Sequence, residues 1–221
     1  MIFILVGGGD EAGRGSVIGP LVVGFVVLTP SQARILKKLG VKDSKQLSRE
    51  KRNFLYKKIK SIAEEVKSYK ISAKEINEAM SNSISLNDLE AIYFARLISN
   101  LKSEPNIIYL DSPEFIEEKF SSKVLSYLDK DLKIVSRHKA DENFVAVSSA
   151  SIIAKVERDR FISYLKKKFN IDIGSGYPSD NITIGALRNE LNRHMLKDYI
   201  RSHWYTINRI RQYTLNRYSS E

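Results

Sequence analysis

The sequence predicts an α/β protein in which a mixed β-sheet is covered by helices and followed by a helical appendage. Two apolar, strand-like runs, at residues 2–6 and 21–28, flank a glycine-rich turn. Strand and helix patterns alternate from residue 48 onward, and residues 183–218 have helical spacing. With 221 residues, 43% of them hydrophobic, the chain can bury a substantial core.

The middle of the chain supplies the alternating elements. Ser72 followed by Glu75 has the pattern of a capping box that opens a short helix. Pro105 ends the helix expected at 85–102, and the strand that follows this proline ends directly at Asp111. The expected helices lie at 48–65, 85–102 and 113–127, with strands at 66–71, 106–110 and 132–136. A long helix rich in small residues follows within 139–169, and a loop at 174–180 precedes the helical tail.

Charge and cysteine content restrict the function. The formal net charge of +10 indicates an anionic partner, for which nucleic acid is the commonest choice, while membrane surfaces and acidic proteins stay open. The absence of cysteine excludes disulfides, a thiol nucleophile and cysteine-ligated zinc, so a reducing cytoplasm is the expected location. The apolar runs at 1–6 and 19–30 are too short to span a bilayer, and we expect no membrane association or targeting segment.

Acidic residues follow several predicted strands. Asp10 and Glu11 come after the first strand, Asp111 ends another, and Asp141 precedes the long helix. If these carboxylates converge, their repulsion requires bound cations, and oxygen ligands favour magnesium or manganese. Two divalent ions about 4 Å apart are the usual apparatus for cutting a phosphodiester. Taken singly, Asp111 and Asp141 could equally be turn or helix-cap residues.

Five motifs, in order along residues 2–205, together resemble ribonuclease HII in its archaeal form. They are "DEAGRG" with "GPLVVG", "KDSKQLS", "YLDSP", "KAD" with "SASIIAKVERDR", and "GSGYPSD". The resemblance implies an RNase H-like fold, a mixed five-stranded sheet flanked by helices with a C-terminal helical subdomain. We expect a catalytic domain at 1–178 and a substrate-binding helical appendage at 179–221.

The resemblance also implies an activity. Such an enzyme is a metal-dependent endoribonuclease that cleaves the RNA strand of RNA/DNA hybrids. It also cuts 5′ of single ribonucleotides in duplex DNA, leaving 3′-hydroxyl and 5′-phosphate ends, in ribonucleotide excision repair and RNA primer removal. A monomer is the default for the family. The implied catalytic and metal-binding residues are Asp10, Glu11, Asp111 and Asp141, which would hold two Mg²⁺ or Mn²⁺ ions.

The resemblance also implies a set of substrate-binding residues. Gly13, Arg14 and Gly15 would bring backbone groups against the ribose 2′-hydroxyl, which distinguishes RNA from DNA locally. Tyr177 would stack on the sugar at the RNA–DNA junction. Lys45 and Lys139 are candidates for binding phosphate, and solvated surface lysines are the alternative. His138 could protonate the leaving group, although the motif does not require it.

The basic tail suggests two further interactions. Its arginines could follow the duplex backbone and add salt-dependent affinity, or simply form a solvated helix face. They are Arg188, Arg193, Arg201, Arg209, Arg211 and Arg217. Gln212, Leu215 and Tyr218 have the spacing of a sliding-clamp ligand that lacks its second aromatic, and an amphipathic last turn is the alternative. Trp204 is expected to anchor the tail.

Other readings stay open from the sequence. A basic RNase H-like domain could bind hybrids without cutting them, although the intact carboxylates argue against this. Resolvase or transposase cores share the fold but lack the Gly-Arg-Gly and Gly-Tyr-Pro elements. The sequence also departs from the family pattern. Gly9 stands where a bulky apolar residue is usual and is expected to loosen Asp10, Ser16 replaces a proline, and "DENF" replaces a tyrosine-proline pairing.

Overall fold

The structure is a computed structural model that describes residues 4–130 and 132–218, with the backbone alone for Arg211 and residues 213–218. The chain forms two compact units. The first unit comprises residues 1–12, 22–69 and 86–156, and the second comprises 13–21, 70–85 and 157–221. The chain therefore passes between the units several times. The domain boundary expected at residue 178 stays a prediction.

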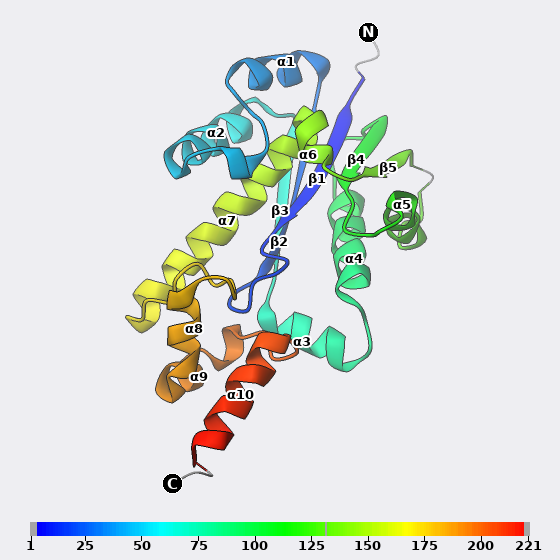
Figure 1. Cartoon of the computed structure of the whole chain (residues 1–221). Coiled ribbons are helices and arrows are strands. Elements are labelled where there is room, and N and C mark those ends of the chain that lie inside the picture. Colours follow the sequence, from blue (N-terminus) through cyan, green and yellow to red (C-terminus); the bar gives the residue numbers. More distant parts are fainter. Residues whose placement is uncertain (1–3, 131, 219–221) are drawn as a thin grey trace. The chain divides into compact units, whose positions relative to one another are not determined.

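A five-stranded mixed sheet forms the centre of the first unit (Figure 1). The strand order is β3-β2-β1-β4-β5, with β1 antiparallel to β2 and parallel to β4, and β4 parallel to β5. The strands are β1 Val6–Ala12, β2 Leu21–Leu28, β3 Glu65–Ile71, β4 Ile107–Asp111 and β5 Ile134–Arg137. The expected mixed, helix-covered five-stranded sheet is confirmed.

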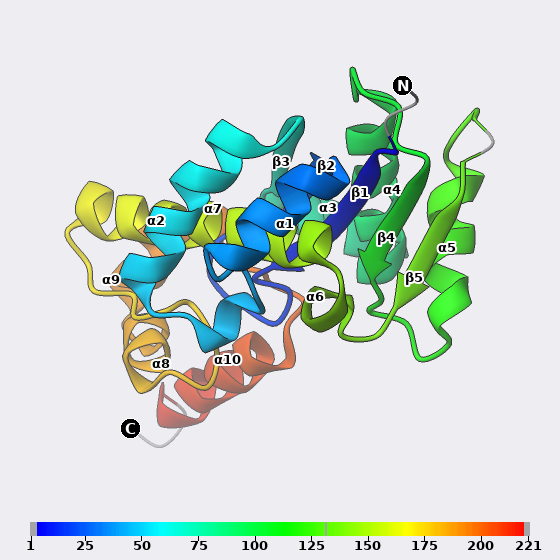
Figure 2. The ribbon, with the colours of Figure 1, turned by 90° about the horizontal axis from the view of Figure 1, so that it is seen from above.

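Helices cover both faces of this sheet. Figure 2 shows α1, α2 and α7 on one side and α4 and α5 on the other. The helices of the first unit are α1 Pro30–Lys38, α2 Arg49–Ile62, α4 Leu86–Ser99, α5 Glu117–Ser126, α6 Ala140–Asn143 and the start of α7 Val145–Phe169, with a short 3₁₀ turn, η1, at Ser44–Gln46. The capping box expected at Ser72 and Glu75 is confirmed at the start of α3 Ala73–Ser81, and Ser48 caps α2, whereas the sequence patterns gave no indication of α1.

The second unit is helical. It contains α3 Ala73–Ser81, the end of α7, α8 Asn181–Arg188, α9 Glu190–Met195, η2 Lys197–Tyr199 and α10 Tyr205–Tyr218. Its core joins residues 17–18 to the tail, because Ile18 forms a β-bridge with Ile200 and both are buried. Trp204 packs on this core, so it anchors the tail within the second unit. Among the described residues, no helix is both long and apolar enough to cross a membrane.

Several expected boundaries were wrong. The first strand was placed at 2–6 by its apolar residues, but β1 begins at Val6 and includes the glycines and both carboxylates. The helix expected from residue 113 begins at Glu117, because residues 112–116 form a loop in which the Ser112 hydroxyl accepts a hydrogen bond from Glu114 N. The tail is four short helical segments rather than one helix, and Asn189 caps the second of them.

Glycines on adjacent strands let α7 lie close to the sheet. A Cβ on Gly8 would lie 2.3 Å from the carbonyl carbon of Ala146, and one on Gly24 would lie 2.6 Å from the carbonyl oxygen of Ala150. On the opposite face, the side chains of Phe94 and Leu110 fill the space beside Gly9, where a Cβ would lie 2.7 Å and 2.6 Å from them. Bulky neighbours therefore occupy the volume that the family's usual side chain would take.

Candidate active site

Two neighbouring parallel strands bring three carboxylates together. Asp10 and Glu11 lie near the end of β1, and Asp111 ends β4, which pairs with β1 in parallel. Each of the three offers an oxygen within 4.8 Å of the others. This convergence is the one that the sequence predicts, because equivalent ends of parallel strands meet at the same sheet edge.

The fourth carboxylate, Asp141, lies on α6 outside this 4.8 Å group. Its helix is tied to β4 in two ways: Ala140 N donates to Asp111 Oδ1 at 2.8 Å, and the Phe144 ring stacks on Tyr109 with centroids 3.8 Å apart. Ser148 Oγ on α7 donates to the Asp141 carbonyl oxygen at 2.6 Å. Phe144 of the divergent "DENF" segment therefore helps to fix Asp141 beside β4.

The cluster is electrostatically unfavourable without a cation. Burial raises the pKa of Asp10 well above its ordinary value, and the charges of Glu11, Asp111 and Asp141 raise it further. The pKa of Asp111 is raised to about 7, first by burial and then by Glu11, against the hydrogen bond from Ala140 and the charge of Lys45. Carboxylates this close stay ionised together only if positive charge is supplied.

The donor set fits a hard divalent cation. All the side chains that converge here offer oxygen ligands, as magnesium and manganese prefer. Glu11 Oε2 is buried and has no hydrogen-bond partner among the described residues. A buried carboxylate oxygen without a partner is costly, and a metal–oxygen bond would satisfy it. Asp10 and Asp111 each offer a further oxygen within 4.8 Å of an oxygen of Glu11.

Lys45 and Asp43 flank the cluster, and of these two only Lys45 is predicted from the sequence. Lys45 is exposed, and partial desolvation lowers its pKa, but the charges of Asp141, Asp10, Asp43 and Asp111 outweigh this and raise it. Asp43 is buried, accepts a hydrogen bond from Lys45 N at 2.9 Å and also bonds with the Asp141 carboxyl. Asp43 therefore links η1, and with it Lys45, to α6. The segment "KDSK" indicates the capping role of Asp43, since an aspartate directly before a turn commonly caps that turn.

Serines continue this link to the first strand. Ser44 Oγ lies 2.8 Å from Ser151 Oγ on α7, and the Ser151 hydroxyl hydrogen-bonds to the Asp10 carboxylate. Asp10 also accepts a hydrogen bond from Glu11 N at 2.7 Å. These contacts orient Asp10 from the helix side and from its own backbone.

In the second unit, Gly13 to Gly15 form a tight turn. Gly13 has a φ of +91°, which favours glycine, and a Cβ there would lie 2.8 Å from Arg158 Nε. Ser16 closes the turn, because its backbone N and its Oγ both donate to the Gly13 carbonyl, at 3.2 Å and 2.8 Å. Serine thus gives this turn two hydrogen bonds that the proline usual at this position could not donate.

A buried arginine holds the turn from behind. Arg201 is fully buried and donates to the Arg14 carbonyl at 2.8 Å and to the Gly19 carbonyl at 3.1 Å. Burial, together with the nearby charge of Arg158, lowers the pKa of Arg201 to about 9. In the sequence, Arg201 is one of several cations of the tail, and only its burial in the fold distinguishes it from the others.

Tyr177 lies beside a second buried arginine. The Arg158 guanidinium lies 4.3 Å from the centre of the Tyr177 ring and donates to the Ser175 carbonyl at 2.7 Å. Val17 N and Ile18 N both donate to the Gly176 carbonyl, at 2.8 Å and 3.1 Å. The glycine-arginine-glycine turn and the tyrosine loop are therefore joined within one unit, and Arg158 contacts both.

The chain matches the family model "Ribonuclease HII" over residues 7–207. It belongs to the ribonuclease HII family. A Methanosphaera stadtmanae ribonuclease HII is 42% identical over 205 residues, covering 93% of this chain and 94% of the relative. The crystal structure of Pyrococcus horikoshii ribonuclease H2 has a TM-score of 0.84 at 39% identity, covering 95% of this chain and 98% of that one.

A second similar structure is the complex of PCNA with ribonuclease HII from Archaeoglobus fulgidus, with a TM-score of 0.82 at 41% identity, covering 93% of this chain and 96% of that one. Family membership makes this chain a nuclease that cleaves the RNA strand of RNA/DNA hybrids. The acidic cluster is consistent with metal binding in that family.

Three other residues that the sequence singles out, Lys139, His138 and Gln212, have exposed side chains. Lys139 is exposed and forms an ion pair with Glu142 at 3.5 Å. His138 is also exposed, and its Nε2 lies 3.3 Å from the Phe115 carbonyl oxygen. Gln212 is exposed on α10, whereas the side chains of Leu215 and Tyr218 lie outside the described part of the structure.

Proposed function

We propose that this ribonuclease HII cleaves RNA/DNA hybrids and also cuts 5′ of single ribonucleotides in duplex DNA, using two divalent cations and leaving 3′-hydroxyl and 5′-phosphate ends. The observation that carries the proposal is the acidic cluster of Asp10, Glu11 and Asp111, with its raised pKa values and the unpartnered oxygen of Glu11. Such a cluster has little structural value, because like charges at this distance oppose folding.

In this proposal, Asp10, Glu11, Asp111 and Asp141 hold Mg²⁺ or Mn²⁺. When bound, the cations would activate water and offset the charge that develops on the scissile phosphate. Asp141 approaches from α6, and its contact with Asp43 fixes the carboxyl orientation. Lys45 faces the same carboxylates and places a positive charge where a substrate phosphate would lie. Lys139, at the exposed start of α6, would bind phosphate in place of its present ion-pair partner, Glu142.

Ribonucleotide recognition is assigned to the second unit. Backbone groups of Gly13 to Gly15 would contact the ribose 2′-hydroxyl, and glycine permits the close approach. Arg201 holds the Arg14 carbonyl at 2.8 Å, so this backbone is fixed before substrate binds. The Tyr177 ring would stack on the junction sugar in an orientation set by Arg158. Together these groups would favour cleavage where RNA passes into DNA.

The test uses a labelled DNA duplex with one ribonucleotide, alongside an all-RNA/DNA hybrid. Wild type and Asp10→Asn are compared with magnesium, manganese and EDTA. We expect metal-dependent cleavage 5′ of the ribonucleotide that disappears in Asp10→Asn. A Tyr177→Ala protein should retain cleavage of the long hybrid while losing most activity at the single ribonucleotide. Tight binding without cleavage in every metal condition would instead indicate a protein that only binds hybrids.

We also propose a sliding clamp as a partner, through Gln212, Leu215 and Tyr218. The support is the spacing of these residues in the sequence and the PCNA complex of the similar A. fulgidus enzyme. Tyr218→Ala should weaken clamp binding strongly while cleavage of a short duplex in the absence of the clamp is unchanged. Unaltered affinity of this variant for the clamp would remove the proposal.

A further inference from the structure

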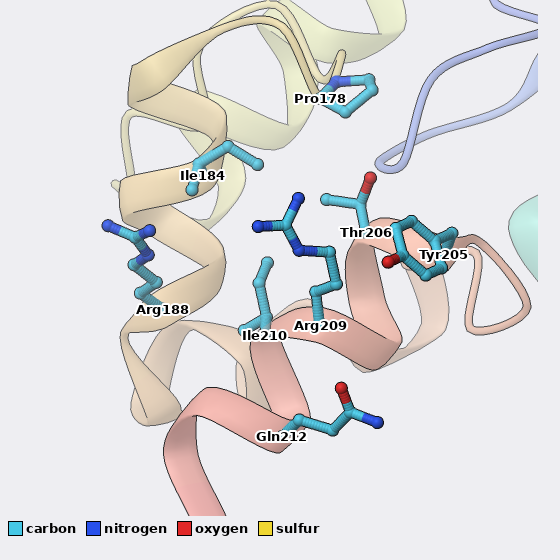
Figure 3. A pocket seen from close by; sticks show the side chains of 8 residues that line it. All are labelled: Pro178, Ile184, Arg188, Tyr205, Thr206, Arg209, Ile210 and Gln212. Carbon is cyan, nitrogen blue, oxygen red and sulfur yellow. The ribbon is translucent and has the colours of Figure 1, made fainter. Parts of the chain in front are cut away.

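A basic pocket lies in the second unit between α8 and α10, with a volume of about 480 Å³ (Figure 3). Its lining residues are Pro178, Ile184, Arg188, Tyr205, Thr206, Arg209, Ile210 and Gln212. A pocket of this size accommodates a group as large as a nucleotide unit. None of the acidic cluster residues belongs to this unit, so the pocket is separate from the carboxylates in sequence and in fold.

The lining has the chemistry of an anion site with an apolar wall. Arg188 comes from α8 and Arg209 from α10, and no acidic residue is among the described residues that line the pocket. Thr206 adds a hydroxyl, and Gln212 adds an amide. Because α10 begins at Tyr205, its first turn directs the positive end of the helix dipole to this side.

Tyr205 gives the pocket a flat edge. Its side chain is 75% exposed, and the Arg209 guanidinium lies 6.0 Å from the ring centre. An exposed aromatic ring beside a planar cation is suited to packing against a sugar or base while the cation binds the phosphate. Ile184 and Ile210 supply apolar surface for the same ligand.

The position of the pocket in the chain connects it with substrate. Pro178, one of its lining residues, directly follows Tyr177, which the proposed function assigns to the junction sugar. A strand that passes Tyr177 would place a nearby sugar-phosphate unit at this pocket. Arginine is the side chain best matched to a phosphate, since its fork donates two parallel hydrogen bonds.

We propose that this pocket binds one backbone phosphate of the nucleic-acid duplex, held by Arg188 and Arg209 with the adjoining sugar against Tyr205. The inference rests on the proposed function, because it assumes that the same duplex also contacts Tyr177. The subsite would carry no sequence preference, because a phosphate contact fixes position and not base identity. The subsite would add a contact between the enzyme and the duplex at a distance from the ribonucleotide.

The first experiment measures duplex binding as a function of salt. Arg188→Gln/Arg209→Gln is compared with a control of equal charge change on exposed positions of α1, Arg34→Gln/Lys37→Gln. Both pairs are placed in an Asp10→Asn background so that the ribonucleotide duplex stays intact. We expect severalfold weaker binding and a salt slope smaller by about 1 for the pocket pair only, as for one lost phosphate contact. Equal slopes in both pairs would overturn the proposal.

The second experiment locates the phosphate. Single methylphosphonate substitutions, which remove one backbone charge each, are scanned along the duplex. One position should weaken binding by the parent protein and have no further effect on the pocket variant, whereas all positions should act additively with the control pair. Additive behaviour at every position would overturn the subsite. An Arg209→Lys variant, which keeps the charge and loses the fork, should give an intermediate loss.

Further measurements distinguish failure of the phosphate subsite from failure of the proposed function. Wild-type cleavage of the same duplex tests the proposed function, and its absence would refute that function whatever the pocket does. If wild type cleaves, the pocket pair in the active background should raise KM with kcat unchanged. Thermal unfolding midpoints of both pairs should match wild type. Inorganic phosphate at millimolar concentration should compete with duplex only weakly, and full competition would indicate a free-anion site instead.

Discussion

Replacing Gly8 by alanine tests whether the close approach of α7 to β1 positions the site. The new Cβ would lie 2.3 Å from the carbonyl carbon of Ala146 and 2.4 Å from Val147 N. Ordinary contact begins at 3.4 Å, so the start of α7 must move by about 3.4 − 2.3 = 1.1 Å. These are backbone atoms, which a rotamer change cannot displace. Overpacking of this kind costs about 1–3 kcal/mol.

The displacement of α7 should also lower the rate of cleavage. Asp141 precedes Ala146 by five residues, on α6 at the start of α7, so a shift of the helix start moves this carboxylate relative to Asp10 and Asp111. A misplacement of about 1 Å can reduce a rate by about 100-fold. For a chain of this size, we expect the unfolding midpoint of Gly8→Ala to fall by about 2–12 °C. Single-turnover cleavage with saturating magnesium should slow by about two orders of magnitude.

Gly185→Ala is the matched control. No atom lies within 4 Å of the position of its Cβ, and alanine stabilises a helix interior by about 0.5–1 kcal/mol relative to glycine. This variant should unfold at or above the wild-type temperature and cleave at the wild-type rate. A Gly8→Ala protein with both wild-type stability and wild-type rate would refute the packing argument. If Gly8→Ala lowers the stability and leaves the cleavage rate unchanged, the packing argument stands and only the proposed effect on the position of Asp141 is refuted.

Three further predictions concern the charges of both units. In EDTA, the unfolding temperature should fall between about pH 4 and 7 and level off above, because the pKa of Asp111, raised from 3.8 to about 7, lets the folded state retain a proton that the unfolded chain has lost. Asp111→Asn should flatten this fall and unfold at a higher temperature than wild type at pH 8, and equal slopes would contradict the pKa assignment. Asp43→Asn should shift the acid limb of the cleavage profile to lower pH, because Asp43 raises the pKa of its neighbour Asp141, and an unmoved limb would show that their contact is only structural. Arg158→Lys should raise KM for the single-ribonucleotide duplex more than for the long hybrid by releasing Tyr177, and an equal effect on both substrates would count against this role.

The sequence predicted those features that depend on local pattern. A β-branched run that ends in Asp111, with Pro105 before it, predicts a strand and places its carboxylate at the sheet edge. β1 was misplaced, because its residues Gly7 to Gly9 have poor strand propensity and are held by cross-strand pairing with β2 and β4. Tertiary pairing of this kind has no signature in local composition.

Buried charges were the other features that the sequence could not predict. In "VERDR" Arg158 is spaced like a solvated helix residue, yet its side chain is 1% exposed and contacts both Gly13 and Tyr177. Asp43 caps a short turn, and nothing in its local sequence indicates that its side chain is buried. Burial of these charges depends on contacts with distant segments, as between Asp43 and Asp141 or between Gly13 and Arg158, so only the folded chain distinguishes these residues from their exposed neighbours.

Each unit contains charged groups whose crowding or burial is electrostatically unfavourable. In the first, carboxylates are crowded so that their pKa values rise. In the second, burial lowers the pKa of Arg201 to about 9, and its Nη2 has no hydrogen-bond partner among the described residues. Both arrangements cost folding free energy in the isolated chain. A divalent cation would relieve the first, so added magnesium or manganese should raise the unfolding temperature of the folded protein. The carboxylates that oppose folding are thus the groups that bound metal ions would neutralise.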